Sequence, residues 1–263
     1  MAEPGIDDLF EQTLQGDYDD EAPWEVVRQL HRLGTREVFD YAAGWCRSAD
    51  PTRRERGCDV VAQLGKIANH PTNNFPEDCY AAVSELVDRE TVAGPLSSAI
   101  LALGHIGDNR ATPLIVRHKD HSDQTVRFAV ACSAGCFPNQ LDCVAALLSL
   151  AADEDEDVRD WATFGVGVLG DVDTEEVRSA LLLRLKDSNE EVREEAMVGL
   201  AKRKDRRVLT ALYAALELKG DFYRPREAAS LMLGMESDRE EWSATEYLAA
   251  LHERFRDEEP CRR

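Results

Sequence analysis

Apolar and polar residues along the chain follow a helical pattern that repeats about every 33 residues. In most copies an apolar residue or proline stands before an arginine, and alanines and other apolar residues follow at intervals of three and four. The clearest copies surround Arg127, Arg159, Arg193 and Arg226, which are 32, 34 and 33 residues apart. Such intervals are typical of helices with one buried face, and a repeat of this length is typical of stacked helix pairs. The pattern predicts an all-α fold, a right-handed α-solenoid.

Two weaker copies extend the array toward the N-terminus and bring the predicted number of helix pairs to about six. One contains Arg54, and the other has Leu96 where the arginine would stand. The 42 residues between these two positions exceed the usual spacing, and a Pro/Asn-rich stretch at 70–76 accounts for the surplus as one long loop.

The ends of the chain differ from its middle. We expect capping helices near residues 24–30 and 244–256, because the terminal repeats need covers for their hydrophobic faces. The repeats and these caps predict a single α-solenoid domain at residues 23–256. The acidic segment 1–22 and the tail 257–263 lie outside it, and we expect both to be flexible.

Polar turns precede the second helix of each pair. Asp153 lies six residues before Arg159, and Asp187 lies six residues before Arg193. Each aspartate could therefore meet the arginine of its own repeat or of a neighbouring one. The spacing predicts a ladder of arginine–aspartate pairs along the stack.

A glycine motif at 165–170 matches G-x-G-x-x-G, the pattern of dinucleotide-binding turns. Such a turn needs a preceding strand and a following helix, whereas these glycines fall inside a predicted second helix. We interpret them as small residues that allow close helix packing. The turn 118–123 contains several types of metal ligand but occupies the same place as the polar turn 186–189, so we interpret it as a polar turn too.

Neither the cysteines nor other reactive residues indicate a catalytic site. The seven cysteines include no Cys-x-x-Cys pair, and we interpret them as small thiols of a reducing compartment. No stretch reaches the roughly 18 apolar residues of a membrane span, and no secretory signal begins the sequence. We expect a cytoplasmic protein that is not an enzyme and uses no metal or cofactor.

Charge indicates the kind of partner. The chain contains 51 acidic and 31 basic side chains, which give a formal net charge of −20. Nucleic acids and anionic membranes require clustered cations, so we expect neither as a partner. A protein with a basic surface would be attracted to this chain, which we expect to be monomeric when free. The alternative is that the acidity serves solubility alone.

The repeated units resemble HEAT repeats, in the short bacterial form also found in phycobilin lyase-type proteins, over roughly residues 36–236. This resemblance implies a protein-binding scaffold whose second helices line the concave face. Deoxyhypusine hydroxylase has a similar architecture but holds iron through several His-Glu pairs, and this chain has only His252-Glu253. HEAT-like alkylpurine DNA glycosylases use a basic groove, which an acidic chain is not expected to have. The resemblance therefore does not imply an enzyme.

The repeat also indicates which positions of the second helices face the core and which face outward. At 100° per residue, the positions one before the arginine and three, six, seven and ten after it face the core. Positions one, five and eight after it then face the other way. These positions and the neighbouring Trp161 give the candidate partner-binding residues of the concave face: Leu101, Phe128, Cys132, Asp160, Trp161, Phe164, Glu194, Val198, Glu227 and Leu231. The alternative is that neighbouring repeats bury these side chains.

Three functions are compatible with these features. We expect a non-catalytic scaffold or adaptor that recognises a protein partner, with a basic surface, through its concave face. A narrower alternative is an immunity protein that neutralises a basic toxin such as a nuclease. A third, which rests on the family resemblance alone, is a lyase-like or chaperone role in attaching a chromophore or cofactor.

Overall fold

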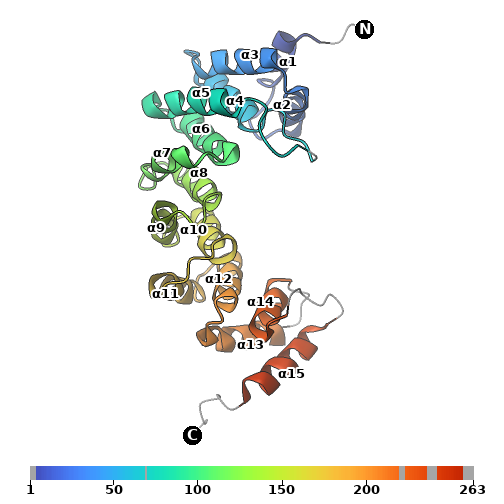
Figure 1. Cartoon of the computed structure of the whole chain (residues 1–263), viewed down its shortest axis with the longest axis vertical. Helices are drawn as coiled ribbons and strands as arrows, with labels where there is room; N and C mark the ends of the chain where they lie inside the picture. Colours follow the sequence, from blue (N-terminus) through green and yellow to red (C-terminus); the bar gives the residue numbers. More distant parts are fainter. Residues whose placement is uncertain (1–3, 69, 219–222, 236–241, 257–263) are drawn as a thin grey trace. The chain divides into compact units, whose positions relative to one another are not determined.

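The computed structural model describes residues 4–68, 70–218, 223–235 and 242–256 (Figure 1). In these residues the fold is all-α, with helices α1 to α15 and a single isolated β-bridge between Ile67 and His70. Helix pairs follow one another along the chain, so the predicted all-α solenoid is confirmed. The helices group into two units, residues 1–146 and residues 147–263, which are described in turn.

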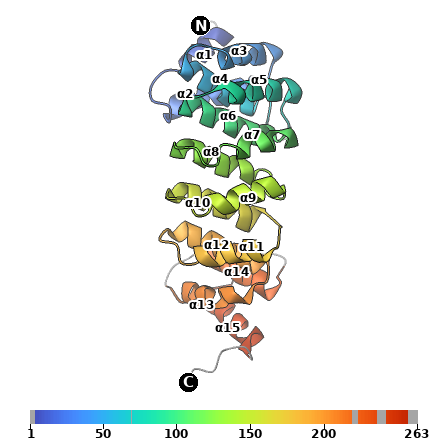
Figure 2. The same cartoon turned by 90° about the vertical axis from the view of Figure 1, so that its left-hand side faces the viewer.

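Unit 1 consists of two layers of helices. The layer of first helices is formed by α3 (Arg36–Cys46), α5 (Pro76–Arg89) and α7 (Thr112–Val116). The layer of second helices is formed by α4 (Pro51–Ala62), α6 (Ala93–Ile106) and α8 (Gln124–Gly135), which lie side by side (Figure 2). At the N-terminal end lie α1 (Ile6–Gln12) and α2 (Glu21–Leu33), and α9 (Leu141–Leu150) spans the division between the units.

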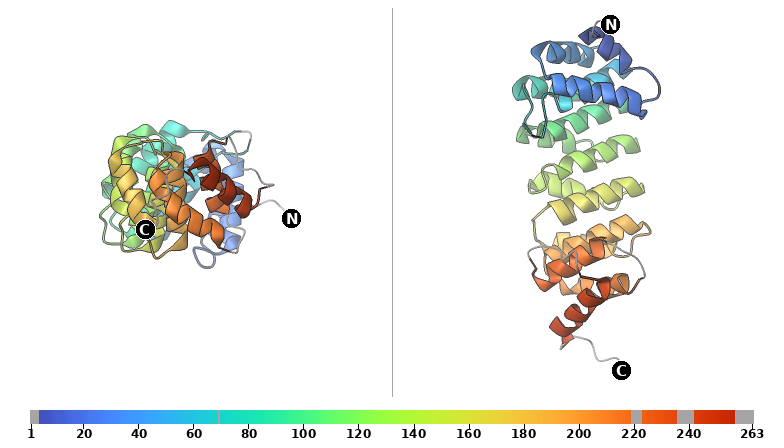
Figure 3. Two further views of the ribbon diagram at one scale, coloured as in Figure 1. Left: turned by 90° about the horizontal axis from the view of Figure 1, so that it is seen from below. Right: turned by 90° about the vertical axis from the view of Figure 1, so that its right-hand side faces the viewer.

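Unit 2 repeats this arrangement, which can be followed from yellow to red in Figure 3. Its second helices are α10 (Glu156–Phe164), which continues as a π-helical turn at Gly165–Leu169, then α12 (Glu190–Lys202) and α14 (Tyr223–Leu233). Its first helices are α11 (Glu175–Arg184) and α13 (Leu209–Glu217). Helix α15 (Ala244–Arg254) packs on α13 and α14 and buries Tyr247 and Leu251 completely, as expected of a cap.

The repeated arginine holds the start of the second helix in place. Its Nη1 donates to the carbonyl oxygens five and six residues earlier, over 2.9–3.2 Å, in the units of Arg54, Arg127, Arg159 and Arg193. Four residues before each arginine, an aspartate or asparagine side chain caps the helix by accepting from its first backbone N–H groups. One short sequence thus fixes both the turn and the helix that follows.

Of the predicted arginine–aspartate ladder, the Arg159–Asp187 pair is present in unit 2, and unit 1 has an equivalent arginine–glutamate pair. Arg159 donates from Nε and Nη2 to the two carboxylate oxygens of Asp187, both at 3.0 Å, and Asp187 belongs to the next repeat. Arg54 makes the same double contact with Glu90, at 2.6 and 3.0 Å. Burial opposes the charged form of Asp187, but the hydrogen bonds from Arg159 hold its pKa below the ordinary value. Neighbouring repeats are therefore joined by bidentate ion pairs.

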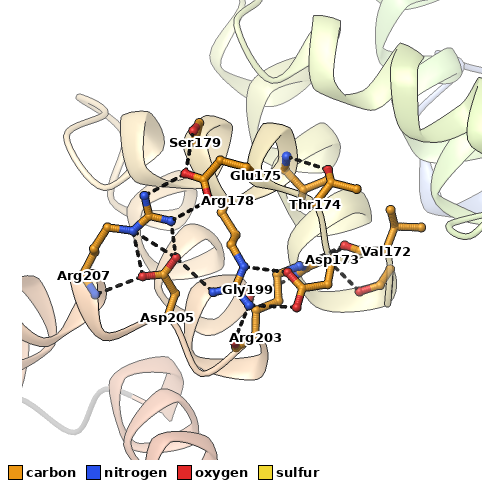
Figure 4. Close-up of polar contacts among 12 residues, drawn as sticks. Val172, Asp173, Thr174, Glu175, Arg178, Ser179, Gly199, Arg203, Asp205 and Arg207 are labelled. Carbon is orange, nitrogen blue, oxygen red and sulfur yellow. Dashed lines mark hydrogen bonds and ion pairs between the residues drawn. The ribbon is translucent and has the colours of Figure 1, made fainter.

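The glycine motif has the packing role predicted for it. Gly167 lies against Gly199 of α12, so closely that a Cβ on Gly199 would be 2.7 Å from the Gly167 Cα. Arg203, which is 7% exposed, donates to the carbonyl oxygens of residues 166, 167, 170, 172 and 199. Figure 4 shows Arg203 beside Val172 and Gly199. A π-helical turn frees carbonyl groups, and this buried guanidinium satisfies them.

The N-terminal segment corrects one expectation. Residues 6–12, placed by the sequence in a flexible stretch, form α1, and Phe10 of this helix is completely buried. Its ring lies 4.6 Å from that of Tyr41 and 4.9 Å from that of Trp45, centroid to centroid. Leu9 and Phe10 are buried, and this apolar burial favours docking of an otherwise acidic segment. The tail at 257–263 lies outside the described residues.

Gly199→Ala is expected to destabilise the protein by about 1–3 kcal/mol, because the new Cβ would meet the backbone of Gly167 and overpack the contact. Gly44→Ala is the matched control. An added Cβ at Gly44, on α3, has no neighbour within 4 Å, so we expect about 0.5–1 kcal/mol of stabilisation. Urea denaturation of both variants measures these effects, and equal stabilities would contradict the packing role.

Candidate protein-binding face

The three candidate residues of unit 1 lie on its second helices. Leu101 is on α6, and Phe128 and Cys132 are on α8. All three are half-buried. They are accessible in part, but no large apolar side chain among them is fully open to solvent.

The seven candidates of unit 2 divide into one buried residue and six at the surface. Val198 is 1% exposed and cannot touch a partner, which corrects its assignment. Positions eight after the arginine, such as Gly104 and Gly167, are buried as well, except the exposed Gly234, because second helices pack side by side and cover them. The remaining residues are half-buried or exposed: Asp160, Trp161, Phe164, Glu194, Glu227 and Leu231.

Trp161 and Phe164 form the aromatic part of this surface. Trp161 is 42% exposed. Its ring meets that of Phe164 edge to face, with 5.9 Å between centroids and an interplanar angle of 89°. The Arg224 guanidinium lies over the other aromatic, 5.7 Å from the Phe164 centroid. An exposed indole supported by a second ring is a rigid contact surface of the kind found in protein interfaces.

Acidic side chains surround these rings. Arg224 of α14 bridges Glu195, at 2.9 Å, and Glu227, at 2.8 Å. The sequence reasoning missed both Glu195 and Arg224. Glu195 stands two residues after Arg193, as Trp161 stands two after Arg159, so the register contained its signal. The residues of this acidic–aromatic face are Asp160, Trp161, Phe164, Glu194, Glu195, Arg224 and Glu227.

Burial shifts the titration of the acidic–aromatic face. It raises the pKa of Asp160 to about 6, and the charges of Glu191 and Asp157 add to the shift. Burial also raises the pKa of Glu195 to about 7, against the opposing charge of Arg224. Burial raises the pKa of Glu194 as well. Raised carboxylate pKa values of this kind are concentrated at functional sites in proteins.

The corresponding surface of unit 1 is covered by the chain itself. The Tyr18 hydroxyl reaches both carboxylate oxygens of Asp59 on α4, at 3.2 Å, and Ser98 Oγ on α6, at 3.2 Å. Arg56 donates to the backbone carbonyls of Thr13 and Tyr18. Burial raises the pKa of Asp59 to about 7. The segment 13–20, which the sequence reasoning treated as flexible, thus lies across two second helices.

Other chemistries are not assembled in the described part of the chain. No three His, Cys, Asp or Glu side chains there are placed to hold a metal ion. Six cysteines in these residues are free, and four of them are buried. No helix there is long and apolar enough to cross a membrane.

Comparison with known proteins defines the class. Residues 144–234 match the family model for HEAT repeats, so the resemblance seen in the sequence is confirmed. These matched residues are HEAT repeats. The chain is similar to Protein YibA of Escherichia coli strain K12, with 26% identity over 213 residues, which are 78% of this chain and 72% of YibA.

Solved structures agree on the fold. An X-ray structure of Escherichia coli YibA matches with a TM-score of 0.71 at 22% identity, over 94% of this chain and 91% of that one. An engineered protein matches with a TM-score of 0.54 at 17% identity, over 87% of this chain and 67% of that one. The phycocyanin lyase complex of CpcE and CpcF from Nostoc sp. PCC7120 gives a TM-score of 0.46 at 18% identity, over 88% of this chain and 82% of that one, which is too low to bear on the fold.

Asp160→Asn is expected to stabilise the protein at pH 8 by about 1 kcal/mol, a value reduced by the partial exposure of the side chain. Folding raises the pKa of Asp160, so wild-type stability present below the ordinary carboxyl pKa of about 4 is lost as the pH rises through about 6. Asparagine does not ionise and avoids this loss. Urea denaturation at pH 4 and pH 8 measures the difference, and a variant less stable than wild type at pH 8 would overturn the electrostatic account.

Proposed function

We propose that this HEAT-repeat protein is a non-catalytic scaffold that binds a protein partner through the layer of second helices. The observation that carries the proposal is Trp161, a large aromatic side chain that is 42% exposed on that layer. Asp160 precedes it in the chain, and Glu194 and Glu227 interact with Arg224, whose guanidinium lies over the neighbouring ring of Phe164. An aromatic anchor with a charged border is the usual composition of a protein interface.

Charge supports a basic partner. The formal net charge is −20, and the acidic–aromatic face contains four acidic side chains but only one arginine. A basic protein would be drawn to this surface at long range, whereas a nucleic acid would be repelled. We expect the chain to act as a monomer in the cytoplasm.

The same charge favours one narrower function. An acidic protein that covers the basic surface of a nuclease would inhibit it, so we retain an immunity protein as the second candidate. Inhibition of the partner's own activity would distinguish this case from a passive scaffold. The likeness to the phycocyanin lyase complex is too weak to support an attachment role, which is not proposed.

Trp161→Ala and Glu194→Lys are expected to abolish capture of the natural partner in affinity purification from the native cell, because they remove the aromatic anchor and reverse a bordering charge. Glu176→Lys on α11 is the matched control, since it reverses an exposed charge on a first helix. We expect it to leave capture unchanged. Mass spectrometry identifies the protein that wild type retains and the two variants lose.

Salt dependence completes the experiment. We expect the captured protein to have a basic surface and its affinity to fall at least tenfold between about 50 and 500 mM salt, since the attraction of exposed charges is screened. A partner that is retained by Trp161→Ala and Glu194→Lys would contradict the proposal.

A further inference from the structure

Two carboxylate oxygens of the acidic–aromatic face have no hydrogen-bond donor in the described part of the chain. They are Oδ1 of Asp160 and Oε2 of Glu195, and both are buried. Glu195 is 8% exposed, and its other oxygen accepts from Arg224. Left without donors, buried polar atoms normally destabilise a fold. The folded chain keeps these oxygens nevertheless, and a hydrogen-bond donor that reached them would relieve the penalty.

Unit 1 shows which groups relieve it. There the carboxylate of Asp59 accepts from the Tyr18 hydroxyl at 3.2 Å and from Arg56 at 3.3 Å. The Arg56 guanidinium also lies over the Tyr18 ring, 4.2 Å from its centroid. The donors are therefore Arg56, which belongs to α4 itself, and the hydroxyl of Tyr18, which the segment 13–20 brings onto α4. In unit 2 no described donor reaches Asp160 Oδ1 or Glu195 Oε2.

Arg224 indicates which cation suits the acidic–aromatic face. It contacts an aromatic ring, Phe164, and two carboxylates at once. One arginine leaves an excess of negative charge among four acidic side chains, and Trp161 offers a second, more exposed ring beside them. A guanidinium stacks on an indole and donates in several fixed directions, whereas an ammonium group is compact and strongly hydrated. The geometry thus favours arginine over lysine.

We propose that the acidic–aromatic face takes an arginine side chain of the partner, which donates to Asp160 and Glu195 and stacks on Trp161. This inference rests on the proposed protein-binding function and deepens it by naming the group that the partner inserts. A divalent metal ion fits less well, because no three acidic, histidine or cysteine side chains in the described ranges converge on one point.

Arginine binding is coupled to proton release. The charged groups around the two carboxylates come from all three second helices: Asp157 and Asp160 of α10, Glu190, Glu191, Arg193, Glu194 and Glu195 of α12, and Arg224 and Glu227 of α14. Asp160 and Glu195 have raised pKa values, and each must lose its proton to pair with a guanidinium. Affinity for the arginine is therefore expected to rise about tenfold or more between pH 5.5 and pH 8.

A labelled hexa-arginine peptide tests the proposal on the full chain. Fluorescence anisotropy gives its affinity, and the indole N–H resonance of Trp161, assigned with Trp161→Phe, reports whether it binds at this face. We expect that resonance to shift on titration. Hexa-lysine should bind at least fivefold more weakly, and hexa-citrulline, which is neutral, should not bind.

Matched substitutions separate the site from general charge. Asp160→Asn, Glu195→Gln and Glu176→Gln each remove one negative charge, and circular dichroism confirms that each variant folds. We expect the first two to weaken hexa-arginine binding at least fivefold at pH 8 and Glu176→Gln to change it less than twofold. Equal effects of all three, an unshifted Trp161 resonance or pH-independent affinity would overturn the arginine site. Capture of the natural partner that still depends on Trp161 would then leave the binding function intact.

Discussion

The paired hydrogen bonds from the repeated arginine to the turn before its helix organise the whole array. They fix where each second helix begins, and an acidic or asparagine cap four residues earlier secures the same point. Because Arg159 also donates two hydrogen bonds to Asp187 of the next repeat, one side chain sets both the local turn and the spacing between repeats. The same register then decides which residues of the second helices face outward.

Close packing of the second helices has a functional consequence. Gly167 and Gly199 bring α10 and α12 together, and the first turns of these helices then place Asp160 and Glu195 near Arg224. Crowded carboxylates with raised pKa values destabilise a fold, and natural proteins keep such features where binding benefits from them. In unit 1 the chain covers the corresponding surface with Tyr18, whereas unit 2 presents its carboxylates around an exposed tryptophan.

Much of the fold could be predicted from the periodicity of the sequence. The helix pairs, the Arg159–Asp187 contact and the packing role of Gly167 all follow from short-range spacing. The assignment of Val198 to the binding face was wrong because an ideal helical wheel ignores the neighbouring helix that buries this side chain. Glu195 and Arg224 were missed because their contact joins two repeats, and sequence spacing does not show which side chains meet across such a boundary.

By itself, the sequence determined the helices, their pairing and the excess of negative charge. These depend on interactions between residues close together in the chain or at a fixed repeat distance. Only the tertiary structure decided that α1 docks through Phe10 and that Tyr18 covers Asp59. It also decided that one oxygen each of Asp160 and Glu195 is buried without a donor among the described residues. Burial and hydrogen-bond satisfaction depend on which surfaces meet in space, and a helical period alone does not specify them.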